Sequence, residues 1–352
     1  MSAVLANAPT SAAIGLSGVW KIFGRRATEA LAAVRAEGLA KDEVLRRFDC
    51  VVAVADVSVD IAEGEIFCIM GLSGSGKSTL LRHVNRLVEP TAGNVSIHGE
   101  DIGRKSSAEL RALRAKKIGM VFQHIALFPH RRIWENVAFG LEVRGEPRER
   151  RREVAMQTLE RVQLSGWGDR YPDELSGGMQ QRVGLARALA ADPDVLLMDE
   201  PFSALDPLIR RQLQEQFLAL ASTMKKTTLF ITHDLDEAIR LGHRIAVMKD
   251  GRFIQLGTAE DIVLRPADDY VAEFVRGVSR LKIVRAHSLM RPLAPGEAGS
   301  VGSDGRAVGD DADLDRMIRI MAEAPGPLLV LDRDRVPVGV VTEAALLRAI
   351  HE

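Results

Sequence analysis

The stretch Gly71-Leu72-Ser73-Gly74-Ser75-Gly76-Lys77-Ser78 decides the fold, because it fits the phosphate-loop pattern G-x-x-x-x-G-K-[ST] at every position. It follows the apolar run Ile66–Met70, which predicts a buried strand, and it precedes a helix predicted from about Lys77 to about Leu87. Glycines let a backbone wrap closely around phosphates, and N–H groups at the start of a helix then face the anion. The segment therefore predicts a site in which Lys77 reaches the β- and γ-phosphates of a nucleotide and Ser78 ligates Mg²⁺.

A second apolar run, Val195–Met198, is followed directly by Asp199 and Glu200. Ligands of open α/β sheets bind at the carboxyl ends of the strands, which is where these two acids fall. Asp199 suits the Mg²⁺ shell, and Glu200 suits orientation or deprotonation of an attacking water. Such an acid pair alone is often a helix cap, but together with the phosphate loop it predicts a hydrolytic site.

Strands and helices alternate around these two motifs, which predicts an α/β domain with a mostly parallel sheet. Residues 1–14 are expected to be a flexible leader, and the domain is expected to span residues 15–277. Residues 124–175 show a helical pattern, and the run Arg148–Arg152 within them is expected to be a solvated helix face. Further strands are predicted at Gly18–Phe23, Val51–Ile61, Asn94–His98, 118–122, Thr228–Thr232 and Arg244–Lys249.

Composition narrows the functional classes. The chain has 352 residues and a formal net charge of −1, so a general nucleic-acid binder with a basic excess is not expected. No apolar run approaches the roughly 18 residues that span a bilayer. If the protein works at a membrane, other chains must therefore cross that membrane. Cys50 and Cys68 are the only cysteines, which is no disulfide framework and suits a reducing cytoplasm.

The segment Leu175-Ser176-Gly177-Gly178-Met179-Gln180-Gln181-Arg182 resembles the signature sequence of ATP-binding-cassette (ABC) ATPases. Other sequence motifs of this family are also present, in the order in which the family has them. Gln123 resembles the Q-loop glutamine, Ser203–Asp206 resembles the D-loop, His233 resembles the switch histidine, and Phe23 resembles the aromatic residue that stacks on adenine. The resemblance covers about residues 15–277 and implies the ABC ATPase fold, with a phosphate-loop core, a mixed sheet and a helical subdomain at 124–175.

The resemblance also implies roles for individual residues. ATP would be bound by Phe23 and by the phosphate loop through Thr79, and Mg²⁺ by Ser78, Gln123 and Asp199. Glu200, His233 and Gln123 would be catalytic. Two copies would form a head-to-tail homodimer, in which the partner's ATP is contacted by Leu175, Ser176, Gly177, Gly178, Met179 and Asp206.

Each mark has a simpler explanation when it is taken alone. Phe23 could be a core residue, with Trp20 a weaker candidate for the stacking role. Gln123 could be a surface residue after a strand, and His233 could cap the following helix, as Asp234 also could. Ser176 could begin a helix without any further role.

Residues 25–50 form an insertion between the predicted adenine aromatic and the next strand. With this insertion and Lys21–Gly24, Ile69–Ser73, Tyr171–Glu174 and Leu205–Arg210, the chain resembles the ATPase subunits of bacterial glycine betaine, proline and choline importers. The resemblance implies membrane permease partners, an indirect substrate-binding protein partner, and a peripheral position at the cytoplasmic face of the inner membrane. Importers of polar amino acids or polyamines remain an alternative within transporters. A soluble ABC ATPase of DNA repair or translation is a remote one, because the chain has one phosphate loop, no heptad array and no cysteine cluster.

Residues 278–352 resemble a single cystathionine-β-synthase (CBS) module, with Pro292–Asp311 expected to be a flexible loop. The matching features are the strand at Gly339–Thr342 and the helix that contains Leu346. Ala345 stands where the family usually places an acid that binds a ribose, and there is room for one module rather than a pair. Both a structural and a regulatory role therefore remain open for this tail.

Overall fold

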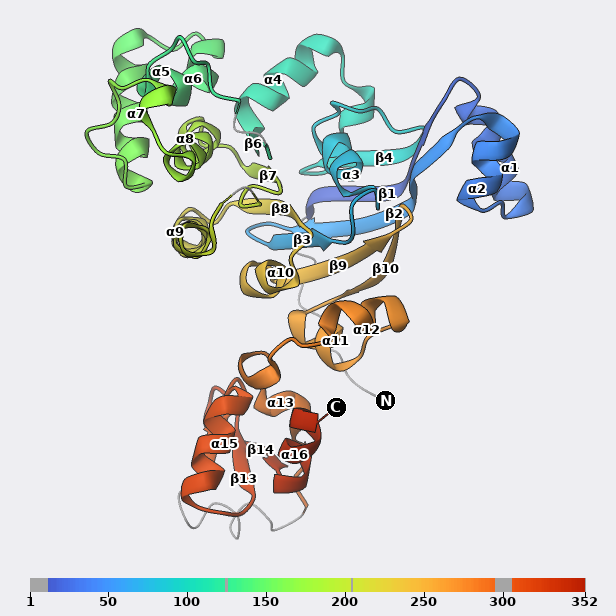
Figure 1. Ribbon diagram of the computed structural model, residues 1–352, viewed down its shortest axis with the longest axis vertical. Helices are drawn as coiled ribbons and strands as arrows, with labels where there is room; N and C mark the ends of the chain where they lie inside the picture. Colours follow the sequence, from blue (N-terminus) through green and yellow to red (C-terminus); the bar gives the residue numbers. More distant parts are fainter. Residues whose placement is uncertain (1–11, 124–125, 204, 295–305, 352) are drawn as a thin grey trace. The chain divides into compact units, whose positions relative to one another are not determined.

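The computed structural model describes residues 12–123, 126–203, 205–294 and 306–351. The chain divides into two compact units, Met1–Leu256 and Gly257–Glu352, which are coloured from blue to yellow and from orange to red (Figure 1). This division falls before the predicted boundary at Gly277. Helices α11 (Ala259–Leu264) and α12 (Asp269–Val275) belong to the second unit.

Two sheets build the first unit. In the four-stranded sheet, of order β2-β1-β4-β5, the pairings β1–β2, β1–β4 and β4–β5 are antiparallel. In the six-stranded sheet, of order β10-β9-β3-β8-β7-β6, β3 pairs in parallel with β8 and β9, and β7 with β6 and β8. The α/β prediction is therefore confirmed. The strands are β1 (Ala12–Phe23), β2 (Val51–Ala62), β3 (Ile66–Met70), β4 (Ala92–Ile97), β5 (Glu100–Asp101), β6 (Ile118–Val121), β7 (Val195–Asp199), β8 (Thr227–Thr232), β9 (Arg244–Lys249) and β10 (Arg252–Gly257).

The three central strands β3, β8 and β7 are buried at every residue, as near-continuous apolar runs predict for strands covered on both faces. Their parallel register places Met70 beside Thr232 and Asp199 beside Ile231. The carboxyl ends of the three strands thus meet at one edge of the sheet. The segments that follow them begin at Gly71, Glu200 and His233, so the fold brings these segments together.

Helices cover the sheets and form two projections of the first unit (Figure 1). The insertion contributes α1 and α2, which pack on strands β1 and β2 through Trp20, Leu31 and Val44. The helical subdomain predicted at 124–175 contains α5 to α7, which pack against α8. The helices of the unit are α1 (Ala27–Glu37), α2 (Lys41–Phe48), α3 (Lys77–Val84), α4 (Ser107–Lys117), α5 (Ile133–Val137), α6 (Phe139–Val143), α7 (Arg148–Arg161), α8 (Gly177–Ala190), α9 (Pro207–Met224) and α10 (Leu235–Leu241), with short 3₁₀ turns at Ile102–Arg104 and Pro172–Glu174.

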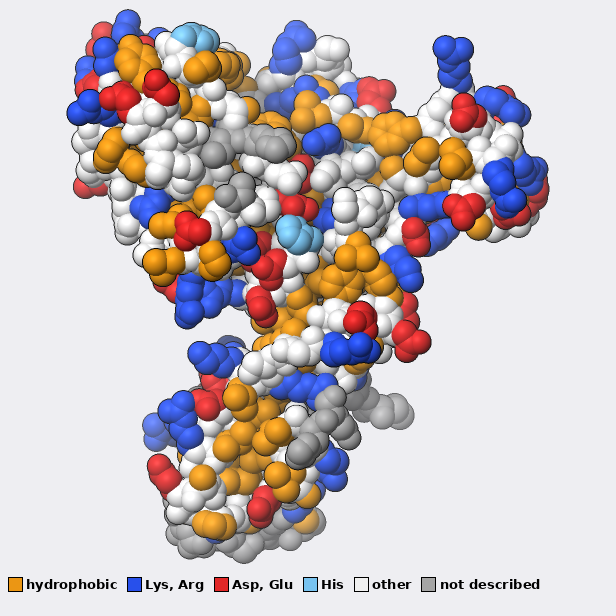
Figure 2. Space-filling model, in the orientation of Figure 1, with side chains coloured by type: hydrophobic (Ala, Val, Ile, Leu, Met, Phe, Trp, Pro, Cys, Tyr) orange, Lys and Arg blue, Asp and Glu red, His pale blue; other side chains and the backbone are white. Residues whose placement is uncertain are grey.

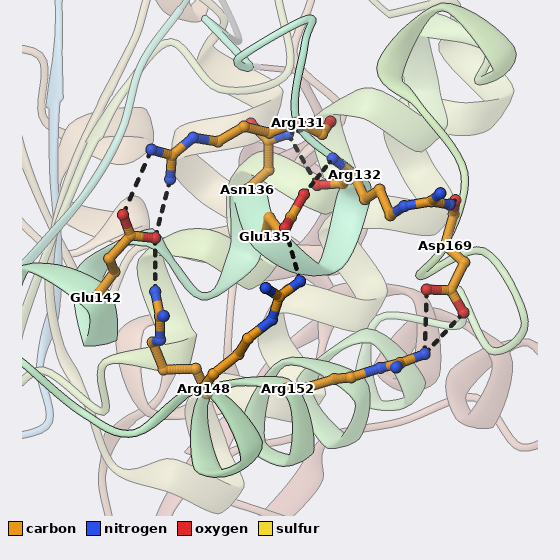
Figure 3. Close-up of polar contacts among 9 residues, drawn as sticks. Arg131, Arg132, Glu135, Asn136, Glu142, Arg148, Arg152 and Asp169 are labelled. Atoms are coloured by element: carbon orange, nitrogen blue, oxygen red, sulfur yellow. Dashed lines mark hydrogen bonds and ion pairs between the residues drawn. The ribbon is translucent and has the colours of Figure 1, made fainter.

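The arginine-rich start of α7 is tied to the rest of the helical subdomain by ion pairs (Figure 3). Arg151 lies 2.6 Å from a carboxylate oxygen of Glu142, which also binds Arg131 at 3.0 Å. Arg152, the next residue of the same helix, contacts Asp169 at 3.0 Å. The expectation of a solvated helix face therefore holds only in part, because these arginines connect α7 to α6 and to the loop that precedes the signature helix.

The second unit has its own sheet, of order β11-β14-β13-β12, and its own core around Leu314, Met317 and Val330. Glu260 of α11 accepts a hydrogen bond of 2.7 Å from the backbone N–H of Arg285, which fixes α11 to this unit. Its remaining elements are a 3₁₀ turn (Arg280–Lys282), α13 (Ala286–Leu289), β11 (Arg291–Pro292), β12 (Ala307–Gly309), α15 (Leu314–Glu323), β13 (Leu328–Leu331), β14 (Pro337–Val341) and α16 (Glu343–His351).

Two predicted flexible segments fall partly outside the described residues. Residues 1–11 of the leader are not described, and β1 begins at Ala12, inside the predicted leader. Of the predicted loop Pro292–Asp311, residues 295–305 are not described, and β11 and β12 occupy positions at its two ends. None of the helices in the described ranges is long and apolar enough to cross a lipid bilayer.

Candidate nucleotide site

The phosphate loop joins the buried end of β3 to the start of α3. Gly71 and Gly76 have φ angles of +154° and +105°, which favour glycine. A Cβ atom at Gly71 would lie 2.2 Å from the carbonyl oxygen of Met248, and one at Gly76 would lie 2.1 Å from that of Ala53. Both glycines are therefore required by the close approach of neighbouring backbone, and the loop wraps as its pattern predicts.

Lys77, the first residue of α3, turns its ammonium back onto this loop. Its Nζ atom donates to the carbonyl oxygens of Gly71 and Leu72, at 2.7 and 2.9 Å. Burial lowers the pKa of Lys77, and the nearby carboxylates of Glu200 and Asp199 act in the opposite direction. The loop thus holds one cation at the place where phosphate charge would arrive.

Asp199 ends strand β7 and is buried, with 3% of its surface exposed. Its Oδ1 atom accepts a hydrogen bond of 2.8 Å from the hydroxyl of Ser78. Arg82, one helical turn after Ser78, lies 3.6 Å from the other carboxylate oxygen. The sequence analysis missed Arg82, although its i,i+4 spacing from Ser78 places the two residues on one face of α3.

Glu200 follows Asp199 with a φ of +44°, a left-handed conformation that is uncommon for residues other than glycine. Its Oε2 atom lies 2.9 Å from Nδ1 of His233, which follows strand β8. The helix after His233 is capped by Asp234, whose Oδ1 accepts from the N–H of Asp236 at 2.9 Å. The cap explanation for His233 is therefore wrong, since its ring contacts Glu200 instead.

These groups face a pocket of about 740 Å³, within the usual size range of ligand sites. Gln123 lines it as well, and it is an exposed residue after strand β6, as the surface-residue explanation also holds. Asp199 lies behind Ser78 rather than on the pocket wall. The pocket is lined by Lys41, Asp42, Leu45, Val51, Val52, Ala53, Leu72, Ser73, Gly74, Gly76, Lys77, Ser78, Thr79, Gln123, Glu200 and His233.

One wall of this pocket was not predicted from the sequence. Lys41, Asp42 and Leu45 come from α2 of the insertion, and Val51 begins the strand that follows it. Nothing in the local pattern indicated this, because the position of α2 depends on how Val44 packs under it.

The predicted adenine aromatic is placed differently from expectation. Phe23 is not among the residues that line the pocket, and its ring lies 4.9 Å from the ammonium of Lys21. It is also not a core residue, since 44% of its surface is exposed, and its register partner on β2 is the pocket residue Val51. Trp20 is buried in the insertion core, which makes it wrong as a stacking candidate.

The signature segment does not line the pocket of its own chain. Ser176 caps α8 by accepting a hydrogen bond from the N–H of Met179 at 3.4 Å, as the simpler explanation holds. A Cβ atom at Gly178 would lie 2.7 Å from Ile209, whereas one at Gly177 would meet no described atom within 4 Å. Gly178 is therefore required by packing against α9, and Gly177 is open. Leu175 is buried, which assigns it a packing position.

One contact connects α8 to the segment after the acids, and one caps the next helix. Gln181 of α8 donates to the carbonyl oxygen of Pro201, directly after Glu200. Asp206 caps α9 by accepting from the N–H of Ile209 at 3.1 Å. Ala204, in the predicted D-loop, lies outside the described residues.

Comparison with known proteins agrees with this geometry. Residues 54–203 match the family described as "ABC transporter". The chain is 52% identical to the glycine betaine transport ATP-binding protein OpuAA of Bacillus subtilis, over 78% of this chain and 65% of OpuAA. It is 45% identical to the glycine betaine/carnitine transport ATP-binding protein GbuA of Listeria monocytogenes, over 94% of this chain and 81% of GbuA.

Among solved structures, the chain resembles the dimeric post-hydrolysis state of the ATP-binding cassette MJ0796 bound to ADP and Pi. The TM-score is 0.59 and the identity 32%, over 70% of this chain and 98% of that one. The match with OpuAA spans just under two thirds of that relative's length, whereas GbuA and MJ0796 are covered more fully. The chain therefore belongs to the ABC transporter family of ATPases.

Proposed function

We propose that this chain is the ATP-hydrolysing subunit of a bacterial importer for a quaternary amine such as glycine betaine, choline or proline betaine. The observation that carries the ATPase part is one pocket lined by Lys77, Ser78, Gln123, Glu200 and His233. The substrate class is supported by the similarity to OpuAA and GbuA, a glycine betaine and a glycine betaine/carnitine transport ATP-binding protein. Polar amino acids and polyamines are the alternative cargo.

The residues at the acid end of the pocket fit Mg²⁺. The Ser78 hydroxyl and the Asp199 carboxylate are hydrogen-bonded, and Gln123 lines the same pocket, so three oxygen donors of the kind Mg²⁺ prefers are available. The ion, when bound, would neutralise phosphate charge. In this proposal Glu200 orients the attacking water and accepts its proton, and His233 positions Glu200 through their hydrogen bond.

The proposal includes a head-to-tail homodimer. Ser176 and Gly177 are exposed and do not face the pocket of their own chain, so they are available to a partner's ATP. Hydroxyl and amide donors at the start of α8 suit a γ-phosphate, and the MJ0796 cassette is dimeric. Asp206, which is exposed, would contact the same partner.

If the chain is the ATPase subunit of an importer, its remaining partners are the other subunits of that importer. The helical subdomain and Gln123 would contact membrane permease subunits, and a periplasmic or lipid-anchored substrate-binding protein would act through that permease. The chain would lie peripherally on the cytoplasmic face of the inner membrane. No nucleic-acid partner is proposed, because the net charge is −1.

Transport by the assembled complex tests this function. Proteoliposomes that hold this chain with its permease subunits and binding protein are expected to accumulate labelled glycine betaine or choline only when ATP is supplied on the ATPase side. ATP-driven uptake of a polyamine or a polar amino acid, without uptake of either amine, would show that the cargo is misassigned. Absence of ATP hydrolysis in the intact complex would contradict the whole proposal.

For residues 278–352 of the second unit we propose a CBS-like module with a structural role. Thr342 caps the final helix through a 3.3 Å hydrogen bond to the N–H of Ala345, and the absence of a carboxylate at position 345 disfavours ribose binding. A chain that ends at Gly277 is expected to retain basal ATP hydrolysis, and its transporter is expected to keep most of its response to internal salt. Exposed charge contacts are screened over about 8–10 Å at physiological salt. Transport that becomes insensitive to ionic strength, while hydrolysis persists, would identify the second unit as a sensor instead.

A further inference from the structure

The pocket extends well beyond the groups that handle phosphate. Gln123, Glu200 and His233 follow the neighbouring strands β6, β7 and β8 at one end, and the phosphate loop follows β3, the strand next to β8. The other end is formed by α2 and the start of β2, which belong to the insertion and the strand after it. Because the insertion has no place in the phosphate chemistry, its presence on the pocket wall needs another explanation.

Apolar side chains at this end are unusually exposed. Leu45 is 49% exposed, Val51 is 54% exposed, and both line the pocket. On the face drawn in Figure 2, hydrophobic side chains gather where β1, β2 and β4 approach the insertion helices. Exposed aliphatic groups that converge on a cavity are typical of a surface that a flat, mainly apolar ligand group covers.

The direction of a bound nucleotide follows from the fixed groups. The γ-phosphate must lie toward Glu200 and His233, where water is activated, and the loop amides hold the phosphate chain. The nucleoside then extends away from Glu200, toward the end where Leu45 and Val51 lie.

Helix α2 presents Leu45 from a firmly held position. The adjacent Val44 is fully buried in the insertion core. Arg47, near the end of α2, lies 2.6 Å from Glu37 on α1, and Lys41, at its start, lies 3.4 Å from Asp250. A side chain held in place before the ligand arrives loses little conformational entropy on binding.

We propose that the insertion helix α2 forms the base-side wall of the ATP pocket, with Leu45 and Val51 in contact with the nucleobase. This inference rests on the proposed ATPase function and deepens it, because it assigns base binding to residues of the insertion and the strand after it rather than to Phe23 alone.

Titration of the full-length chain with ATP and with inorganic tripolyphosphate tests whether Leu45 and Val51 contact the nucleobase. Leu45→Asn replaces an apolar group by a polar one of similar size and is expected to raise the Kd for ATP about threefold to tenfold. The Kd for inorganic tripolyphosphate, which has no base, is expected to stay unchanged. Leu87→Asn is the matched control, because it makes the same change at an exposed leucine that does not line the pocket, and it should bind ATP like the wild type.

The possible outcomes separate the inference from its premise. If the Kd for ATP is unchanged in both Leu45→Asn and Val51→Asn, the proposal that these residues contact the nucleobase is wrong. It is also wrong if these variants lose equal affinity for ATP and for tripolyphosphate. If Phe23→Ala loses much of its affinity for ATP and Leu45→Asn loses none, the base is bound by Phe23 rather than by the insertion. Failure of the wild type to bind or hydrolyse ATP would instead contradict the proposed function itself.

Discussion

Glu200→Gln is expected to lower the rate of ATP hydrolysis by about 10²–10⁴, the usual effect of removing a positioned base. The substitution keeps the side-chain shape and leaves the left-handed backbone at this position as it is. It removes the carboxylate that would take a proton from water, while the phosphate loop stays intact. ATP affinity should therefore change little, and single-turnover hydrolysis should show the whole loss.

The same variant should accumulate an ATP-bound dimer, because closure requires ATP and reopening requires hydrolysis. Size-exclusion chromatography in ATP is expected to show more dimer for Glu200→Gln than for the wild type. Glu160→Gln, at an exposed position on α7, is the matched control and should behave like the wild type. Normal hydrolysis in Glu200→Gln would mean that another group activates the water.

The parts of the site predicted from sequence are those encoded by neighbouring residues. The glycine spacing of 71–78 and the acids after β7 are local patterns, and the parallel sheet brings their ends together whatever the surface residues are. Ser78 and Asp199 are consequently hydrogen-bonded as their predicted roles require. The central strands were equally predictable, because burial on both faces demands continuous apolar runs.

The parts that sequence did not predict depend on packing between distant segments. Strand β10 lies at the edge of its sheet and is only partly buried, so its pattern carries little signal. The side chain of Leu45 lies one position from the buried Val44, and only the placement of α2 decides that it faces the nucleotide pocket. Phe23 was assigned the adenine-stacking role because of the family resemblance. That resemblance says nothing about how the insertion changes the pocket next to Phe23.

Lys77→Ala is expected to have the second large effect, on binding as well as on rate. Among the described residues of the phosphate loop, Lys77 supplies the only cation, and its ammonium is 2.7 Å from the loop's first carbonyl. Charge-assisted hydrogen bonds contribute about 1.5–3 kcal/mol each, so the Kd for ATP should rise by roughly tenfold to a hundredfold. Hydrolysis and transport should be abolished, because phosphate charge in the transition state would also lose this partner.

Equilibrium titration with ATP and with tripolyphosphate measures the effect of Lys77→Ala. Both ligands should lose affinity, because Lys77 lies at the phosphate end of the pocket, in contrast to the expected result for Leu45→Asn. Lys116→Ala removes an exposed ammonium on α4 that does not line the pocket, and it should bind both ligands like the wild type. Unchanged ATP affinity and turnover in Lys77→Ala would show that the loop amides and helix α3 alone hold the phosphates. The buried ammonium would then serve mainly to stabilise the loop, and unfolding in denaturant would reveal that role as a lower free energy of unfolding.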